Sequence, residues 1–272
     1  MQSRPASIHP YTHIVFNIHI FCYTPLMSKE THHIHLDTYL TPHQIKEACA
    51  ISNPENLTER QVCTINQEFQ QGFNLFEKYN SELEKSVTFY GSARFTLDNP
   101  TYKKIYTLAR RIGEELGYAI ITGGASGVME AANHGAFDAG VPSIGLTIAL
   151  SHEQSTNKYV THEVPFDFFF TRKTLLKFSA ETYIFCPGGY GTLDEFFDLL
   201  TLVQTKKIPP VPLILYGVEF WTPLVEFFKK TLIETYNTVS FDETPFVVTD
   251  NDDEILEIIK NSPIRTNDNS FA

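Results

Sequence analysis

The sequence predicts an α/β protein: a Rossmann-like, doubly wound parallel sheet with helices on both faces, preceded by an N-terminal helical extension. From residue 85 onward, short apolar runs rich in β-branched and aromatic residues alternate with helical segments, a pattern typical of parallel sheets. Two of these runs end in glycine-rich turns that open a helix. Because such folds bind ligands at the carboxyl ends of their strands, both turns are candidate sites.

The chain before the sheet is predicted to begin with a flexible arm, residues 1–38. Its histidines come without the carboxylates or cysteines that a metal site needs, so a solvated arm is the favoured interpretation. Residues 1–26 match no element of the fold, and Met27 opens a stretch that reads like an ordinary protein start. We therefore expect deletion of residues 1–26 to leave folding and activity unchanged.

Residues 39–84 are predicted to form the helical extension. Thr41 suits the N-cap of a first helix, with Pro42 at the first helical position. A second helix is expected from about residue 57 to residue 79.

Residues 85–272 are predicted to form the sheet domain. The expected strands lie at 87–92, 118–124, 143–148, 182–189, 211–217 and 245–250. The expected helices lie at about 101–116, 126–139, 192–207, 219–235 and 252–261, and another is expected to begin at Arg172 within the segment 167–180. The stretch from 149 to 166 is expected to be a long loop.

Composition narrows the possible partners. A net charge of −11 disfavours a nucleic-acid polymer, because binders of nucleic acid need a basic surface. It does not exclude a single small phosphate ester in a local pocket. No apolar run reaches the length of a membrane-spanning helix. The cysteines, at positions 22, 49, 63 and 186, form no metal-binding or CxxC spacing, so we expect a reduced, cytoplasmic protein.

The two glycine turns are candidate phosphate sites. The first contains Gly123, Gly124 and Gly127; the second contains Gly188, Gly189 and Gly191. Glycine lets a phosphate approach the backbone, and a helix start offers free N–H groups. Either turn alone is also explained by tight packing. No acidic residue follows at the spacing of a dinucleotide site, and neither turn carries the lysine of a P-loop, which leaves a smaller anion such as a sugar monophosphate.

The helix after the second turn poses a choice for Glu195. Thr192 and Glu195 have the spacing of a capping box, in which Glu195 would only stabilise the helix start. The expected core stripe is Leu193, Phe196, Phe197, Leu200 and Val203. Glu195 would then lie on a second face with Leu199 and Leu202, at a pocket wall or subunit contact. That second apolar face predicts a symmetric homodimer or a higher oligomer.

Arg172 and Lys173 follow directly on an apolar run and begin a helix. They are either ordinary surface residues or cations that reach the second glycine turn. In the second case Arg172 would hold a phosphate or a carboxylate through two parallel hydrogen bonds.

Taken together, Gly-Gly-x-x-Gly-x-Met, Arg-Lys and Pro-Gly-Gly-x-Gly-Thr-x-x-Glu resemble the Lonely Guy-type cytokinin riboside 5′-monophosphate phosphoribohydrolases. Many members of that family carry the label "possible lysine decarboxylase". The resemblance covers roughly residues 87 to 248 and looks most like the longer bacterial branch. One departure is Ala125 and Ser126 in the first turn, which affects the fit of the substrate.

The resemblance implies hydrolysis of a nucleoside 5′-monophosphate to free base and ribose 5-phosphate, without metal or other cofactor. It implies Arg172 and Glu195 as catalytic residues. The candidate substrate- and phosphate-binding residues are Gly188, Gly189, Gly191, Thr192, Gly123, Gly124, Lys173, Ser92 and Glu130. A decarboxylase would need a lysine for pyridoxal phosphate, which no local pattern identifies.

Two alternatives stay open. One is a nucleotide sensor or carrier without turnover on the same scaffold, and the other is a different enzyme of small phosphates. The preferred base is not encoded in a readable pattern. We expect the base to contact the loop at 149–165 and the N-terminal helices.

Overall fold

The computed structural model describes residues 57–82, 85–149, 155–240 and 245–263, which lie in the compact unit that begins at Asn56. The expected arm and the helix expected to start at Thr41 lie outside the described residues.

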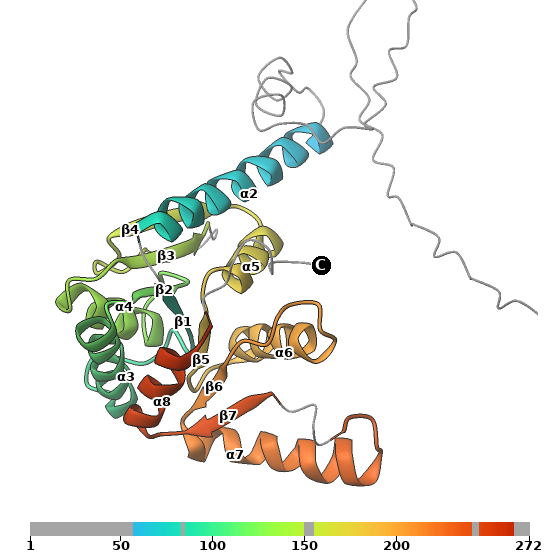
Figure 1. Ribbon diagram of the computed structural model, residues 1–272. Helices are drawn as coiled ribbons and strands as arrows, with labels where there is room; N and C mark the ends of the chain where they lie inside the picture. Colours follow the sequence, from blue (N-terminus) through green and yellow to red (C-terminus); the bar gives the residue numbers. More distant parts are fainter. Residues whose placement is uncertain (1–56, 83–84, 150–154, 241–244, 264–272) are drawn as a thin grey trace, which may run out of the picture. The chain divides into compact units, whose positions relative to one another are not determined.

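The described chain folds around a seven-stranded parallel sheet with helices on both faces, which confirms the predicted fold class (Figure 1). The strand order is β4-β3-β2-β1-β5-β6-β7, with every neighbouring pair parallel. The strands are β1 (Ser86–Tyr90), β2 (Ala119–Thr122), β3 (Ser143–Ile148), β4 (His162–Phe166), β5 (Thr182–Phe185), β6 (Leu213–Tyr216) and β7 (Phe246–Thr249).

The chain reverses direction across the sheet at β1. The strands β2, β3 and β4 follow on one side of β1, whereas β5, β6 and β7 lie on the other. The loops after β1, β2 and β5 therefore meet at one edge, which is where doubly wound sheets bind ligands.

Two helical layers cover the sheet and bury it on both faces. The helices are α2 (Leu57–Glu82), α3 (Pro100–Arg111), α4 (Val128–Asp138), α5 (Phe169–Phe178), α6 (Tyr190–Gln204), α7 (Val218–Phe227) and α8 (Asp252–Asn261). Buried side chains of α3, α4 and α8 form one core with the sheet. Those of α5, α6 and α7 form the other, and apolar residues of α2 pack against it.

Two helices continue in π-helical geometry, as η1 (Ile112–Leu116) after α3 and η2 (Phe228–Thr235) after α7. The sequence predicted each pair as one longer helix, because the apolar periodicity does not separate the two geometries. Gly117, at φ +71°, ends the first of these pairs.

The strand β4 was not expected, since its residues were assigned to a loop. Its sequence His-Glu-Val-Pro-Phe lacks a run of apolar residues, and it contains Pro165. It nevertheless pairs along its length with β3, with Pro165 opposite Thr147. Proline is tolerated because β4 lies at the edge of the sheet.

Helix α2 contacts α5 and β4. Cys63 in this helix is disulfide-bonded, so the expectation that all cysteines are reduced is wrong for this position. Cys186 is free and buried. Among the described helices, none has both the length and the apolar character needed to cross a membrane.

Candidate active site

Ser92 joins the two glycine turns at the carboxyl edge of the sheet. Its N–H donates to the carbonyl of Pro187 in the turn after β5, at 3.0 Å. Its carbonyl accepts from the N–H of Val128, which begins α4 after the first glycine turn, at 2.9 Å. The Ser92 side-chain oxygen accepts from the N–H of Arg94. The structure therefore brings Ser92 and both turns together.

Helix α6 begins two residues earlier than expected. Gly189 is its N-cap, Tyr190 is its first residue, and no side chain caps it. Thr192 is thus the third helical residue and Glu195 the sixth, whereas a capping box needs Thr at the N-cap and Glu at the third position. The capping interpretation of Glu195 is wrong. The first N–H groups of α6 have no intrahelical acceptor and are available to an anion.

The expected core stripe of α6 is also wrong in part. The buried residues are Thr192, Phe196, Leu199 and Val203. Phe197, expected in the core, is 40% exposed. Glu195 lies one turn before Leu199, so its side chain leaves the helix toward the buried side. Leu199 belongs to the core of its own chain, so it is no evidence for a subunit contact. The expected dimer stays a prediction.

One oxygen of the Glu195 carboxylate is buried without a hydrogen-bond partner. This atom, Oε2, is inaccessible to solvent and bonds to none of the described groups. Burial raises the pKa of Glu195 to about 7, against the opposing positive charges of Lys173 and Arg172. A buried and unsatisfied carboxylate oxygen costs free energy, and such strongly shifted groups are concentrated at functional sites.

Arg172 lies between β3, the first glycine turn and Glu195. Its Nε donates to the carbonyl of Leu146 at 2.6 Å, and its Nη2 lies 3.4 Å from the carbonyl of Gly123. Burial lowers the pKa of Arg172, and the charge of Glu195 opposes that shift. Neither of these two bonds uses Nη1, which stays available to a ligand. The sequence analysis expected Arg172 to reach the second glycine turn, whereas its hydrogen bonds go to Leu146 and to Gly123 of the first turn, and it acts on Glu195 of α6 through its charge.

Tyr90 is a member of this group that the sequence analysis missed. It is the last residue of β1, and its ring stacks on Phe185 at 4.9 Å between centroids. Its hydroxyl is buried with no hydrogen-bond partner among the described residues. Burial and then the charge of Glu195 raise the pKa of Tyr90. The available signal was a tyrosine at the end of a buried strand, directly before Gly-Ser, where the loops converge.

The second glycine turn leaves space that the protein does not fill. A Cβ atom placed on Gly189 or Gly191 would meet no atom within 4 Å. Neither residue has a positive φ. Gly188 differs, since a Cβ atom there would lie 2.1 Å from Oγ1 of Thr192. Neither a positive φ nor close packing therefore requires glycine at 189 and 191, and the space beside the start of α6 is open there.

The first glycine turn is filled by the protein itself. A Cβ atom on Gly123 would lie 2.0 Å from Nη2 of Arg172. Gly124 and Gly127 both have φ of +72°, and a Cβ atom on Gly127 would lie 2.2 Å from the carbonyl oxygen of Ser92. These glycines are explained by backbone geometry and close packing.

Two predicted binding residues have other partners. Nζ of Lys173 pairs with Asp194 at 2.8 Å and with Asp198 at 3.2 Å, so it connects α5 to α6. Glu130 acts electrostatically on Tyr102. The pKa of Tyr102 is raised mainly by burial and next by Glu130. Among the described residues, no hydrogen bond or ion pair joins Glu130 to Glu195 or Arg172.

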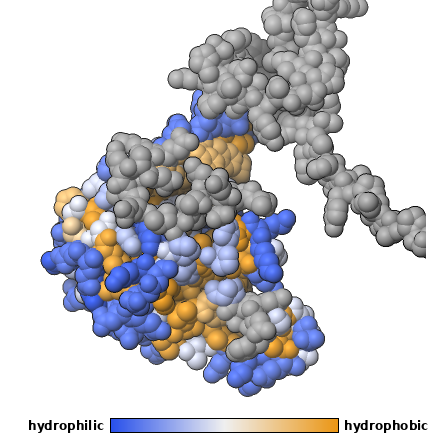
Figure 2. All heavy atoms as spheres, viewed as in Figure 1, coloured by the Kyte–Doolittle hydropathy of each residue, from blue (hydrophilic) through white to orange (hydrophobic). Residues whose placement is uncertain are grey.

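Aromatic side chains surround the loop edge. Phe169 and Phe170 at the start of α5, and Phe220 at the start of α7, are exposed. Tyr190, the first residue of α6, is 92% exposed. Apolar residues are visible at the surface in Figure 2, among hydrophilic ones. Among the described residues, no group of His, Cys, Asp and Glu has the arrangement of a metal site.

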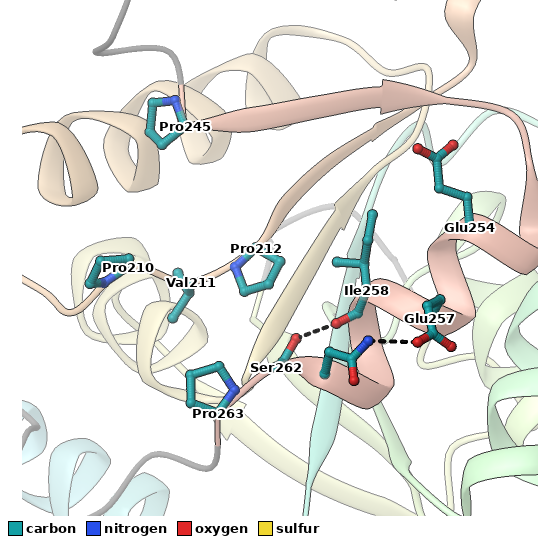
Figure 3. Close-up of a pocket in the computed structure, with 10 residues that line it drawn as sticks. Pro210, Val211, Pro212, Pro245, Glu254, Glu257, Ile258, Ser262 and Pro263 are labelled. Carbon is teal, nitrogen blue, oxygen red and sulfur yellow. Dashed lines mark hydrogen bonds between the residues drawn. The ribbon is translucent and has the colours of Figure 1, made fainter.

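A separate pocket lies at the opposite edge of the sheet (Figure 3). It is lined by the segments that precede β6 and β7, with Pro212 and Pro245, and by α8. Two hydrogen bonds lie within its lining, because Ser262 donates to the carbonyl of Ile258 and Asn261 donates to Glu257, whereas Glu254 accepts from Thr249 in β7. It lies away from the glycine turns, so it does not contribute to the candidate site.

The fold places the chain among the doubly wound α/β proteins. Residues 129–259 match the family described as possible lysine decarboxylase, and the chain belongs to that family. The match contains both Arg172 and Glu195.

Curated relatives match about half of the chain. An uncharacterized protein of Archaeoglobus fulgidus is 30% identical over 129 residues, which cover 44% of this chain and 82% of that protein. A cytokinin riboside 5′-monophosphate phosphoribohydrolase of Rhodococcoides fascians is 26% identical, over 44% of this chain and 62% of that enzyme. The corresponding rice enzyme, from Oryza sativa subsp. japonica, is 30% identical, over 47% and 55%. The chain thus spans less than two thirds of the two named enzymes.

Solved structures are similar at a lower level. An X-ray structure from a structural genomics consortium has a TM-score of 0.49 at 22% identity, covering 65% of this chain and 98% of that one. A molybdenum cofactor binding protein of Rippkaea orientalis has a TM-score of 0.45 at 25% identity, covering 64% and 93%. Scores below 0.5 decide nothing about the reaction.

Proposed function

We propose that this protein hydrolyses the N-glycosidic bond of a nucleoside 5′-monophosphate, a cytokinin riboside monophosphate or an AMP-like nucleotide, to free base and ribose 5-phosphate. The observation that carries the proposal is the buried, unpartnered Oε2 of Glu195, which lies beside Arg172 in a helix whose start has no side-chain cap. The names of the two phosphoribohydrolases that the chain resembles support it.

The phosphate group binds at the start of α6. The first N–H groups of the helix and its dipole favour a negative charge there. Gly189 and Gly191 leave room for phosphate oxygens, since no protein atom occupies the space that a side chain would fill. Arg172 adds a second positive contact through its Nη1 atom, and Ser92 holds the two turns in register.

Glu195 acts on the sugar. Cleavage of the bond between C1′ and the base passes through an oxocarbenium-like state, as in glycoside hydrolysis. A buried carboxylate stabilises that positive charge or takes a proton from the attacking water. The water oxygen then bonds to C1′, and the departing base nitrogen takes up a proton. Only the ionised carboxylate can stabilise the positive charge or accept the proton, so activity rises as the pH rises through the raised pKa of Glu195.

The test is base release by the full chain, measured chromatographically with AMP and with isopentenyl-AMP. Glu195→Gln removes the charge and keeps the shape, so turnover should fall on the order of 100-fold or more, about 3 kcal/mol. Arg172→Ala should cost at least as much. Glu219→Gln is the matched control, because Glu219 is an exposed carboxylate in the first turn of α7.

Equal rates for wild type and Glu195→Gln would contradict the proposed role of Glu195. A wild type that binds AMP but releases no base would instead favour the sensor or carrier, in which Glu195 is dispensable. The ratio of the two substrate rates tells cytokinin nucleotides from ordinary purine nucleotides.

A further inference from the structure

Glu68 is a buried carboxylate far in sequence from the motifs of the site. It lies in α2, outside the residues that match the family, and is 4% exposed. Its Oε1 accepts from the N–H of Asp167 at 2.5 Å, and its Oε2 accepts from the hydroxyl of Thr171. A buried carboxylate is costly unless it is bonded, and here both oxygens bond to the same short segment.

That segment is the start of α5. Phe168 is the N-cap of α5, and its own side chain provides no cap. Asp167 precedes the N-cap and Thr171 is the third helical residue. Glu68 therefore supplies from α2 the acceptor and the negative charge that a helix start favours.

The contact between the two helices extends along α5. A Cβ atom on Gly72 would lie 2.3 Å from Cδ1 of Leu175, so glycine permits a close approach one turn after Glu68. The rings of Phe73 and Phe178 lie 6.0 Å apart at the other end of α5. Helix α2 thus fixes both the position and the rotation of α5.

Arg172 is the next residue after Thr171. Its N–H donates to the carbonyl of Phe168, and its guanidinium reaches Leu146 and Gly123. The rotation of α5 sets where this guanidinium lies relative to Glu195. Small displacements of a catalytic group cost large factors in rate.

We infer that Glu68 is a positioning residue for Arg172, acting through the start of α5, so that the helix preceding the sheet domain is part of the active-site machinery. This inference rests on the proposed function and extends it to a helix that the family match does not include.

A double-mutant cycle in the full chain tests it, with base release from AMP as the readout. Glu68→Ala alone should lower kcat/KM at least about tenfold, because Arg172 loses its support. Glu68→Gln keeps an acceptor for Asp167 and should retain activity within about threefold of wild type. Gln71→Ala, an exposed position on the same helix, is the matched control and should change nothing.

The second arm repeats Glu68→Ala in an Arg172→Ala background. If Glu68 acts through Arg172, the second loss should be less than about twofold, since the supported group is already absent. A residue that merely stabilises the fold would lower activity equally in both backgrounds. Thr171→Val provides the same cycle with a shape-conserving change if Glu68→Ala does not fold.

Additive losses in the two backgrounds, or full activity of Glu68→Ala and Thr171→Val, overturn the inference while the proposed function stands. An inactive wild type overturns both.

Discussion

The two glycine turns look alike in sequence but serve different purposes. In the first turn, Gly127 has a positive φ and the carbonyl of Ser92 occupies the place of its side chain. In the second, Gly189 and Gly191 have ordinary backbone angles and empty space around them. One turn uses glycine to let the protein pack, and the other uses it to keep space clear. The proposed function uses this difference, since it assigns the phosphate to the second turn.

The largest expected effect is the loss of stability when a substitution disrupts the first turn. Gly127→Ala forces a side chain into a left-handed backbone position and against backbone atoms of Ser92 and Ala93. The free energy of unfolding should fall by about 2–4 kcal/mol, measured by urea denaturation. A loss below about 0.5 kcal/mol would show that this turn adapts and that its glycines are not structural.

The next prediction concerns the pH dependence of stability at the second turn. Because burial raises the pKa of Glu195 to about 7, the folded protein binds this proton more tightly than the unfolded chain. Wild-type stability should therefore fall as the pH rises through the interval between the ordinary glutamate pKa and about 7.

Glu195→Gln carries no such charge, so at pH 8 it should be more stable than wild type by about 1–3 kcal/mol, and the two should converge near pH 4. Thermal unfolding across this pH range measures it. Lys173, Arg172, Asp194, Lys177 and Tyr90 are the charged and titratable groups that act on Glu195 and are unchanged in both proteins. A less stable Glu195→Gln at pH 8 would mean that the carboxylate stabilises the fold.

A matched glycine substitution sharpens the contrast. Gly191→Ala adds a methyl group to open space inside a helix, so stability should stay equal or rise by up to about 1 kcal/mol. The methyl group occupies the proposed phosphate position, so KM for AMP should rise about tenfold, or about 1.4 kcal/mol. Unchanged KM values would move the phosphate away from the start of α6.

The smallest expected effect concerns Tyr90. Tyr90→Phe removes a hydroxyl that bonds to no described residue, so the fold should lose nothing. If the hydroxyl binds the ligand, kcat/KM should fall about threefold, the size of one ordinary hydrogen bond. An increase in melting temperature with unchanged kinetics would make it an unsatisfied group without a role in the site.

The sequence predicted the larger features of the fold well. Strand 143–148 and helix 252–261 match the structure residue by residue, because each has a clear apolar period and a clear start. The edge strand β4 was missed, since an edge strand needs neither an apolar run nor a full set of N–H donors. The capping assignment at Thr192 failed because α6 already begins at Tyr190 and includes Gly191, although glycine disfavours a helix.

The residues of the candidate site stay a prediction, and their contacts come from the structure alone. Motif order placed Arg172 and Glu195 near the second turn, and the structure brings them together. Nothing in the local pattern separates the packed glycine at 127 from the open one at 191. Glu68 was beyond reach for another reason: its partners lie 99 and 103 residues away, and no sequence period encodes that distance.

The proline in β4 also affects how the molecule meets other molecules. The carbonyl of Phe166 accepts from the N–H of Ala149, which follows β3, so the backbone groups of Phe166 face β3. Because successive residues of a strand alternate in direction, the backbone groups of Pro165 face the open edge of the sheet. A foreign strand that added to this edge would find no N–H donor at Pro165, and one rung of the new ladder would be missing. Pro165, which made β4 hard to predict from the sequence, thus also disfavours edge-to-edge aggregation of the sheet.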